Sequence, residues 1–280
     1  MATFAGTMQN PRLKAMVVPR EHGAWGMLLV PLATGAVVAA GSAINPLALS
    51  LFVIATLALF WLRTPVEAWI GTSAIRVHTR RERTAVLRVA VILSIVAVVA
   101  IAALFRLGYS RGLLIVGTAA ALSFALQALV KNTGRGGRMP AQLIGAVGLT
   151  STAASAYYVA TGHLNLLAMS LWLANWLFAG NQVHFVQLRI HASRASSLQV
   201  KARQGYLFLI GQLVLLTVIG LLSRLRIFPE FAVLAFGPAV LRGTAWFLPG
   251  PQPLDVHKLG FSELFQSIVF GALLCVAFLV

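Results

Sequence analysis

A succession of long apolar runs constrains the fold of this chain more than any other sequence feature. Each run has roughly 17 to 25 residues, and a helix that crosses a bilayer needs about 20. Backbone groups find no hydrogen-bond partners in lipid, so only helices and closed barrels span it, and the two-residue alternation of a barrel is absent. The sequence therefore predicts an all-α polytopic membrane protein with about nine transmembrane helices. The predicted spans are roughly 23–40, 46–62, 86–105, 112–130, 141–160, 164–188, 205–222, 231–248 and 264–280.

The charge balance points to a membrane protein and away from a nucleic-acid binder. Charged residues make up 10% of the chain, against about 25% in an ordinary soluble domain. The net charge is +16, but a nucleic-acid reader needs a folded basic face, whereas Lys and Arg here lie in short gaps between apolar runs. The single cysteine, Cys275, lies inside the last run, so we expect no disulfide framework and no thiolate metal site.

The positions of the basic residues predict which side of the membrane each gap occupies. With nine spans, 18 of the 22 Lys and Arg residues fall on one side. Because connecting segments rich in Lys and Arg stay in the cytoplasm, we expect a cytoplasmic N-terminus. The gaps on the other side are mostly a few residues long, so function is expected to face the cytoplasm. The prediction is one transmembrane domain over 1–280, with a cytoplasmic arm at 1–20 and cytoplasmic loops at 64–85, 131–140, 189–204 and 249–263.

Ionisable residues near the start of the first run form one candidate site. The stretch "VVPREHGAWG" (17–26) places Glu21 and His22 at the start of a predicted helix. Helix N-termini carry partial positive charge, which favours a carboxylate there, so Glu21 is either a cap or a functional group. Neighbouring helical residues point about 100° apart, so both side chains cannot cap the same end.

The end of the sixth run supplies a second cluster, "NQVHFVQLRIHASR" (181–194). On a helix, Asn181, His184, Gln187 and His191 share one face. Two interpretations stay open for this stripe: hydrogen bonds that hold neighbouring helices together, or a functional pocket that includes His184 and Arg189.

At the end of the second run, Arg63 and Glu67 are four residues apart. Proline lacks a backbone N–H and clashes with the preceding turn, so Pro65 is expected to break the helix between them. A local ion pair is the simpler account of these two residues.

A spacing of 121 residues separates Glu21 from Gln142 and Gln142 from Glu263. All three lie where a predicted span begins on the cytoplasmic side. Parallel four-helix repeats followed by a ninth helix would give this pattern, and so would coincidence.

The motif "PREHGAW" (19–25) resembles the signature of the YwiC-like family of bacterial membrane proteins. Further similar stretches are "LWLANWLFAGNQVHFVQLRI" (171–190) and "KLGFSELFQSIVFGALL" (258–274). This resemblance implies a multi-pass protein of the bacterial cytoplasmic (inner) membrane and carries no established activity or cofactor.

The predicted helix order also resembles the UbiA prenyltransferase superfamily, which implies a UbiA-like bundle. In that superfamily, aspartate-rich motifs after the second and sixth helices hold magnesium and a prenyl diphosphate. Here the corresponding positions offer only Glu67 and "NQVH" (181–184). Because magnesium requires oxygen ligands, usually carboxylates, we expect no magnesium-diphosphate site and no classical prenyl transfer.

The remaining interpretation is a cytoplasm-facing pocket with an apolar interior and a polar mouth. Such a pocket suits an isoprenoid or quinone-like lipid. Two alternatives stay open: a small-molecule or proton-coupled transporter, with a cavity that reaches both faces, and a non-catalytic membrane assembly factor. The candidate pocket residues are Glu21, His22, Arg63, Glu67, Asn181, His184 and Arg189.

Overall fold

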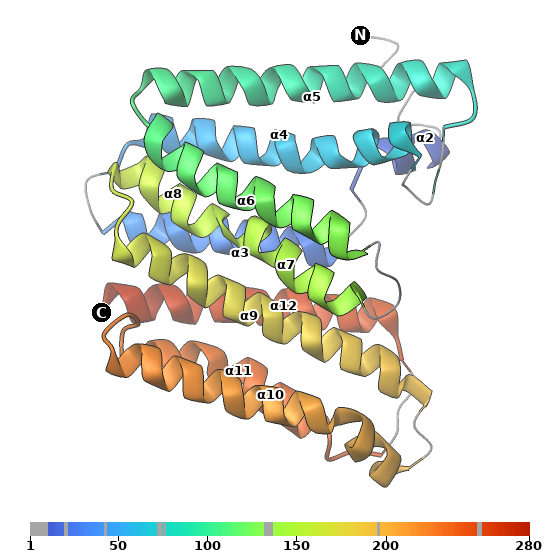
Figure 1. Ribbon diagram of the computed structural model, residues 1–280, viewed down its shortest axis with the longest axis vertical. Coiled ribbons are helices and arrows are strands. Elements are labelled where there is room, and N and C mark those ends of the chain that lie inside the picture. Colours follow the sequence, from blue (N-terminus) through green and yellow to red (C-terminus); the bar gives the residue numbers. More distant parts are fainter. Residues whose placement is uncertain are drawn as a thin grey trace. The chain divides into compact units, whose positions relative to one another are not determined.

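The structure, a computed structural model, describes residues 11–19, 22–41, 44–71, 75, 77–131, 137–194, 197–250 and 254–280. These residues form helices joined by short connections, and none of them lies in a β-strand (Figure 1). The chain divides into two compact units. Unit 1 comprises Met1–Glu21 and Asn45–Ser110, and unit 2 comprises His22–Ile44 and Arg111–Val280.

Unit 1 is built around two long helices, α4 (Pro46–Ile70) and α5 (Arg80–Arg106), that pack on each other. The short helix α2 (Pro11–Val17) packs against both, where Met16 joins the buried side chains of Ala68 and Val86. The indole Nε1 of Trp61 donates to the carbonyl oxygen of Val17 at 2.6 Å. An apolar contact and a directional hydrogen bond thus hold α2 in place.

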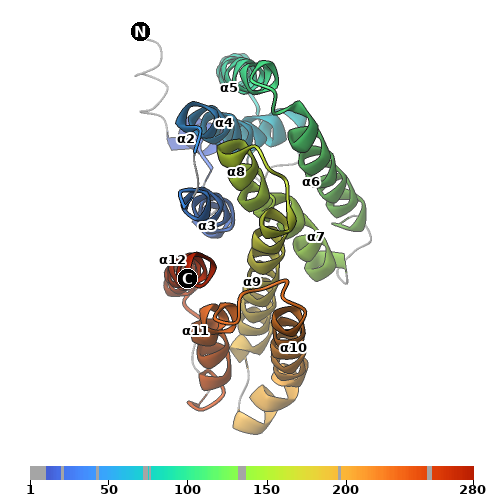
Figure 2. The ribbon, with the colours of Figure 1, turned by 90° about the vertical axis from the view of Figure 1, so that its left-hand side faces the viewer.

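Unit 2 contains the remaining helices, with α9 (Leu166–His191) at its centre (Figures 1 and 2). Helix α9 contacts α3, α7, α8, α10, α11 and α12. Because it has neighbours on most sides, its polar residues face several different helices. The other elements of unit 2 are α3 (His22–Ala39), α6 (Ser110–Lys131), α7 (Arg138–Thr150), α8 (Thr152–Thr161), η2 (Ala192–Arg194), α10 (Leu198–Arg224), α11 (Ala232–Ala245) and α12 (Val256–Leu279).

The predicted span 141–160 is interrupted once, between α7 and α8. Three consecutive hydroxyl residues occupy this position, Thr150, Ser151 and Thr152. Their side chains donate to the carbonyl oxygens of Ala146, Gly148 and Leu149, one turn back. Such back-bonding competes with the helical ladder and bends helices.

Close approach of backbones holds α3 against α8 and α12. A Cβ atom at Gly35 on α3 would lie 2.1 Å from the carbonyl oxygen of Ala153 on α8. A Cβ atom at Gly271 on α12 would lie 2.7 Å from a side-chain carbon of Val30 on α3. Only glycine, which has no Cβ, permits these distances.

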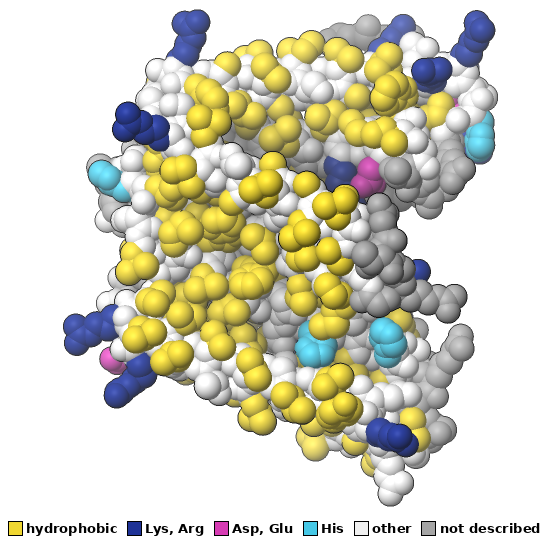
Figure 3. All heavy atoms as spheres, in the orientation of Figure 1, with side chains coloured by type: hydrophobic (Ala, Val, Ile, Leu, Met, Phe, Trp, Pro, Cys, Tyr) yellow, Lys and Arg dark blue, Asp and Glu magenta, His cyan; other side chains and the backbone are white. Residues whose placement is uncertain are grey.

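Among the described residues, six helical stretches are long and apolar enough to cross a membrane, with α7 and α8 taken together as one stretch. They are Pro46–Ile70, Arg80–Arg106, Ser110–Lys131, Arg138–Thr161, Leu198–Arg224 and Val256–Leu279, and two shorter apolar helices are Ala24–Ala39 and Ala232–Ala245. Helix α9 is not among them, because its asparagine and glutamine side chains lower its mean hydropathy. Figure 3 shows apolar side chains along the helices and Lys and Arg side chains near their ends. The all-helical membrane fold is confirmed, whereas the number of nine spans and the UbiA-like bundle stay predictions.

One local prediction is wrong. Helix α4 continues through Pro65 to Ile70, so the proline does not break it. Buried prolines are tolerated in apolar helices when neighbouring groups compensate for the lost hydrogen bond. Helices α12 and α7 begin at Val256 and Arg138, inside stretches predicted as cytoplasmic loops, and the loops themselves stay a prediction.

The carboxylate of Asp255 caps the start of α12 by accepting from the backbone N–H groups of His257 and Lys258, each at 3.0 Å. The N–H of Lys258 is the main cause that holds the pKa of Asp255 below its usual range. The polar residues before the last apolar run thus begin the helix.

Candidate functional site

Two tryptophans fix the orientation of α9 relative to α7. The indole Nε1 of Trp172 donates to the carbonyl oxygen of Val147 at 2.9 Å, and that of Trp176 donates to Leu143 at 3.1 Å. The two tryptophans are four residues apart, so they lie on one face of α9. With this face held against α7, Asn181 is directed toward α10 and Gln182 toward α12.

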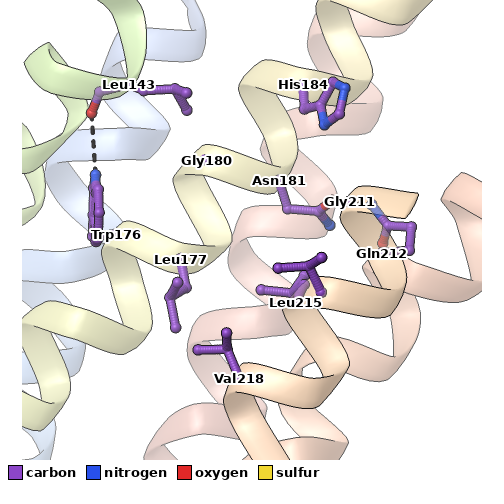
Figure 4. A pocket seen from close by; sticks show the side chains of 11 residues that line it. Leu143, Trp176, Leu177, Gly180, Asn181, His184, Gly211, Gln212, Leu215 and Val218 are labelled. Carbon is purple, nitrogen blue, oxygen red and sulfur yellow. Dashed lines mark hydrogen bonds between the residues drawn. The ribbon is translucent and has the colours of Figure 1, made fainter. Parts of the chain in front are cut away.

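A groove of about 230 Å³ lies between α9 and α10, with one wall contributed by α7 (Figure 4). Its apolar lining comes from Leu143, Trp176, Leu177, Val214, Leu215 and Val218. Its polar lining is confined to Asn181, His184 and Gln212, and Gly180 and Gly211 complete it. The groove is therefore an apolar hollow with three hydrogen-bonding side chains at one part of its wall.

Asn181 of α9 and Gln212 of α10 meet across the groove (Figure 4). Gln212 Nε2 donates to Asn181 Oδ1 at 2.5 Å. Both residues are buried, with exposed fractions of 7% and 3%. Asn181 Nδ2 and Gln212 Oε1 have no hydrogen-bond partner among the described residues. Pairing two amides uses one N–H and one carbonyl oxygen, so a donor and an acceptor remain whichever way the amides are assigned.

His184 lies one turn along α9 from Asn181, on the same side of the groove (Figure 4). Its ring meets the edge of Phe208 with ring centroids 5.1 Å apart. A Cβ atom at Gly211 would lie 3.1 Å from His184 Nδ1, so the glycine leaves room for the imidazole beside α10. His184 makes no hydrogen bond within the described part of the chain, so its ring nitrogens are available to a ligand.

The rest of the predicted stripe on α9 has other neighbours. Gln187 Nε2 donates to Gln142 Oε1 of α7 at 2.8 Å, which is the interhelical bonding considered for this stripe. His191 Nδ1 lies 2.8 Å from the carbonyl oxygen of Gln187 within α9, near the helix end. Arg189 lies over the ring of Trp246, with its Cζ 5.8 Å from the ring centroid. Asn181 and His184 are therefore the two predicted candidates that line the groove.

The other predicted candidates lie outside this groove or outside the described residues. Arg63 Nε and Glu67 Oε1 are 2.7 Å apart on α4, so the predicted local ion pair is confirmed. This pair belongs to unit 1, whereas Asn181, His184 and Arg189 belong to unit 2. Glu21 and the side chain of His22 lie outside the described residues. The convergence of all seven candidates on one pocket stays a prediction.

Sequence reasoning missed Gln212 as a partner of Asn181 and missed the ion pair between Arg242 and Glu263. Arg242 Nη1 on α11 contacts Glu263 Oε1 on α12, and both side chains are largely buried. The spacing of Glu21, Gln142 and Glu263 was the only sequence signal for Glu263. Gln212 is a lone glutamine in an apolar run, and its partner Asn181 lies on another helix, so the sequence gives no signal for this pair.

The chemistry of the groove is that of a neutral hydrogen-bonding site. No acidic residue lines it, and no group of three His, Cys, Asp or Glu side chains in the described ranges could hold a metal ion. Asn181 offers a donor, Gln212 offers an acceptor, and His184 offers both in its neutral form. The arrangement can bind a hydroxyl or carbonyl group whose attached carbon skeleton lies against the apolar wall.

The family model described as YwiC-like protein matches residues 18–158, just over half of the 280-residue chain. This match covers "PREHGAW" (19–25) and confirms the predicted family. The stretch that carries Asn181 and His184 follows the matched region. No curated protein matches the chain.

Proposed function

We propose that this chain, an integral membrane protein that belongs to the YwiC-like family, is a lipid-binding protein. In this proposal, the groove between α9 and α10 binds an isoprenoid or quinone-like lipid. The proposal places the protein in the bacterial inner membrane with a cytoplasmic N-terminus, in agreement with the distribution of basic residues. The bound group in this proposal is the hydroxyl or carbonyl head of the lipid.

The observation that carries the proposal is the pair of unpartnered atoms, Asn181 Nδ2 and Gln212 Oε1, at the wall of the groove. Asn181 is ten residues before the end of α9, which is about 15 Å along the helix axis. At that depth, a buried polar atom without a partner costs about 1–3 kcal/mol. A ligand hydroxyl satisfies both atoms, because it accepts from Asn181 and donates to Gln212.

The walls of the groove favour a lipid over a soluble metabolite. Leu177, Leu215 and Val218 provide apolar surface next to the polar pair. Val214, on the α10 wall, is 56% exposed, and α10 is a candidate span, so this wall continues to the lipid-facing surface. A hydrocarbon tail can therefore leave the groove toward the bilayer while the head stays at the amides.

Fluorescence of Trp176 tests the proposal directly, because this indole lines the groove and quinones quench tryptophan emission. The protein, in phosphatidylcholine nanodiscs, is titrated with a benzoquinone that carries a decyl tail. We expect saturable quenching that is largely lost in Trp176→Phe and retained in Trp69→Phe, which removes an exposed tryptophan of unit 1.

The double variant Asn181→Leu/Gln212→Met replaces both amides by apolar side chains of similar shape. Exchanging both partners together is nearly neutral for stability, so the variant is expected to fold. Its quinone affinity is expected to fall by up to about tenfold, because a quinone carbonyl is an acceptor and loses its hydrogen bond from Asn181 Nδ2.

Thr217→Val is the matched control, because it makes an apolar exchange on the exposed face of the same helix, where Thr217 bonds only to Leu213. Wild-type quenching in the double variant, or equal quenching in Trp176→Phe, contradicts the proposed site. The same titration with a decyl alcohol as competitor separates an isoprenoid-alcohol ligand from a quinone.

A further inference from the structure

A second polar cluster lies at another face of α9, between α9, α11 and α12. Arg242 Nη1 donates to Glu263 Oε1, and the two side chains are 16% and 8% exposed. Phe185 covers the flat face of the guanidinium, with Arg242 Cζ 4.2 Å from the ring centroid. Gln182 Nε2 donates to the carbonyl oxygen of Glu263 at 2.8 Å and to Ser267 Oγ at 3.0 Å. A charged pair is thus enclosed by aromatic and amide groups.

The ion pair leaves one complete edge of the guanidinium unused. Arg242 Nε and Nη2 are buried and have no hydrogen-bond partner among the described residues. These two nitrogens lie on the same edge, where their N–H groups form the fork that binds two oxygens of one anion. Glu263 Oε2 is also buried without a described partner. The cluster therefore presents a bidentate donor next to a single acceptor.

The surrounding charge favours an anion. Arg189 interacts electrostatically with both Arg242 and Glu263, and Lys201 interacts electrostatically with Arg189. The ammonium of Lys201 already donates to the carbonyl oxygens of Trp246 and Pro249. Arg189 makes no hydrogen bond within the described ranges. Two arginines thus face a single carboxylate, which leaves an excess of positive charge.

We infer that Arg242 and Arg189, together with Glu263, form a binding site for a phosphoryl group that carries a P–OH. Two phosphoryl oxygens accept from Arg242 Nε and Nη2, and the remaining P–OH group donates to Glu263 Oε2. An ionised carboxylate or a sulfate has no hydroxyl to donate, so it would bring its charge against Glu263. This phosphoryl group belongs either to inorganic phosphate or to the phosphomonoester of a lipid head group of the phosphatidic acid type. This inference does not depend on the groove between α9 and α10.

The simpler account is that Arg242 and Glu263 only hold α11 against α12. A buried pair of this kind adds little net stability, because desolvation offsets the attraction. That account explains the bond through Nη1, but it leaves Nε, Nη2 and Oε2 unexplained. It also predicts no response of the protein to phosphate.

The test measures thermal stability of the detergent-purified full chain as phosphate or sulfate is added at constant ionic strength. We expect phosphate to raise the melting temperature in a saturable way and sulfate to have no such effect. Arg242→Lys keeps the charge but loses the fork, so the affinity for phosphate is expected to fall at least about tenfold. Arg224→Lys is the matched control, because it makes the same exchange at an exposed residue, the last of α10.

Glu263→Gln changes the selectivity, which a purely structural ion pair does not predict. The amide no longer repels a fully ionised anion, so we expect this variant to bind sulfate as well as phosphate. Because each variant is compared with itself in the absence of the anion, a lower starting stability does not obscure the result. Three outcomes would overturn the inference. The wild type could respond equally to phosphate and sulfate, or respond to neither with or without lipid. The affinity for phosphate could also be unchanged in Arg242→Lys.

Two lipid arms identify the source of the phosphoryl group. Nanodiscs that contain phosphatidic acid carry a phosphomonoester, whereas those that contain phosphatidylglycerol carry a diester without a P–OH group. Selective retention of phosphatidic acid in native mass spectra, lost in Arg242→Lys, supports a lipid head group. Stabilisation by inorganic phosphate without that retention supports a free phosphate.

Discussion

At the scale of single residues, Lys201 shows how a cation is accommodated in an apolar helix. Its residue is 2% exposed, and its Nζ donates to the carbonyl oxygens of Trp246 at 2.5 Å and Pro249 at 2.8 Å. The ammonium also lies 4.1 Å from the centroid of the Trp246 ring. Lys201 therefore caps the C-terminal end of α11, where a cation is favourable.

Replacing Lys201 by methionine keeps the aliphatic stem but removes the ammonium. We expect the free energy of unfolding to fall by about 1–3 kcal/mol, because two carbonyl oxygens lose their partner. The measurement is the fraction of protein that stays monodisperse in detergent after heating. Lys258→Met is the control, since that side chain is 86% exposed and its contact with Asp255 spans 3.7 Å. Equal losses in both variants would contradict the capping role.

The sequence was sufficient to select Asn181 and His184, because polar and titratable residues in an apolar run are costly and therefore informative. It was insufficient for Gln212 and Arg242, since the function of a lone polar residue depends on which helix it faces. Pro65 was misread for a related reason: local chemistry predicted a break, and the packing of α4 overrode it.

At the scale of helices, Gly35 is the position where α3 approaches α8 most closely among the described glycines. Gly35→Ala would place a methyl group 2.1 Å from the carbonyl oxygen of Ala153, so one of the two helices must shift. We expect a loss of about 1–3 kcal/mol in stability, measured by the same heating assay.

The control for Gly35→Ala is Gly220→Ala, at a helical position of α10 with no neighbouring atom within 4 Å. Alanine there is expected to leave stability unchanged or to raise it by about 0.5–1 kcal/mol, because alanine favours a helix. If Gly35→Ala retained wild-type stability, the tight contact between α3 and α8 would be wrong.

Apolar runs located the helices well, because length and hydropathy are properties of contiguous sequence. Helix ends were less predictable, as α4 and α12 extend into polar residues such as Glu67 and Lys258. The break between α7 and α8 was also missed, since it depends on side chains that bond to their own backbone.

At the scale of the whole molecule, the proposed topology places Arg224 outside and Lys258 in the cytoplasm, on opposite sides of the short helix α11. With Cys275 changed to serine, Arg224→Cys is expected to react with a membrane-impermeant maleimide in intact cells. Lys258→Cys and Lys14→Cys are expected to react only after the membrane is permeabilised. The measurement is the mass shift of the labelled protein.

Equal labelling of Arg224→Cys and Lys258→Cys would show that α11 does not cross the membrane, and the count of nine spans would be wrong. Labelling of Lys14→Cys in intact cells would contradict a cytoplasmic N-terminus. A single membrane domain over residues 1–280 stays a prediction, as do the transporter and assembly-factor alternatives.

The indole bonds from Trp172 and Trp176 to the backbone of α7 have a mechanical consequence for the groove. They join α7 and α9 at two points one turn apart, so these helices resist separation and act as a stiff frame. Among the described residues, one side-chain hydrogen bond, between Asn181 and Gln212, ties α10 to this frame. A ligand larger than the groove must therefore displace α10, while α7 and α9 stay together.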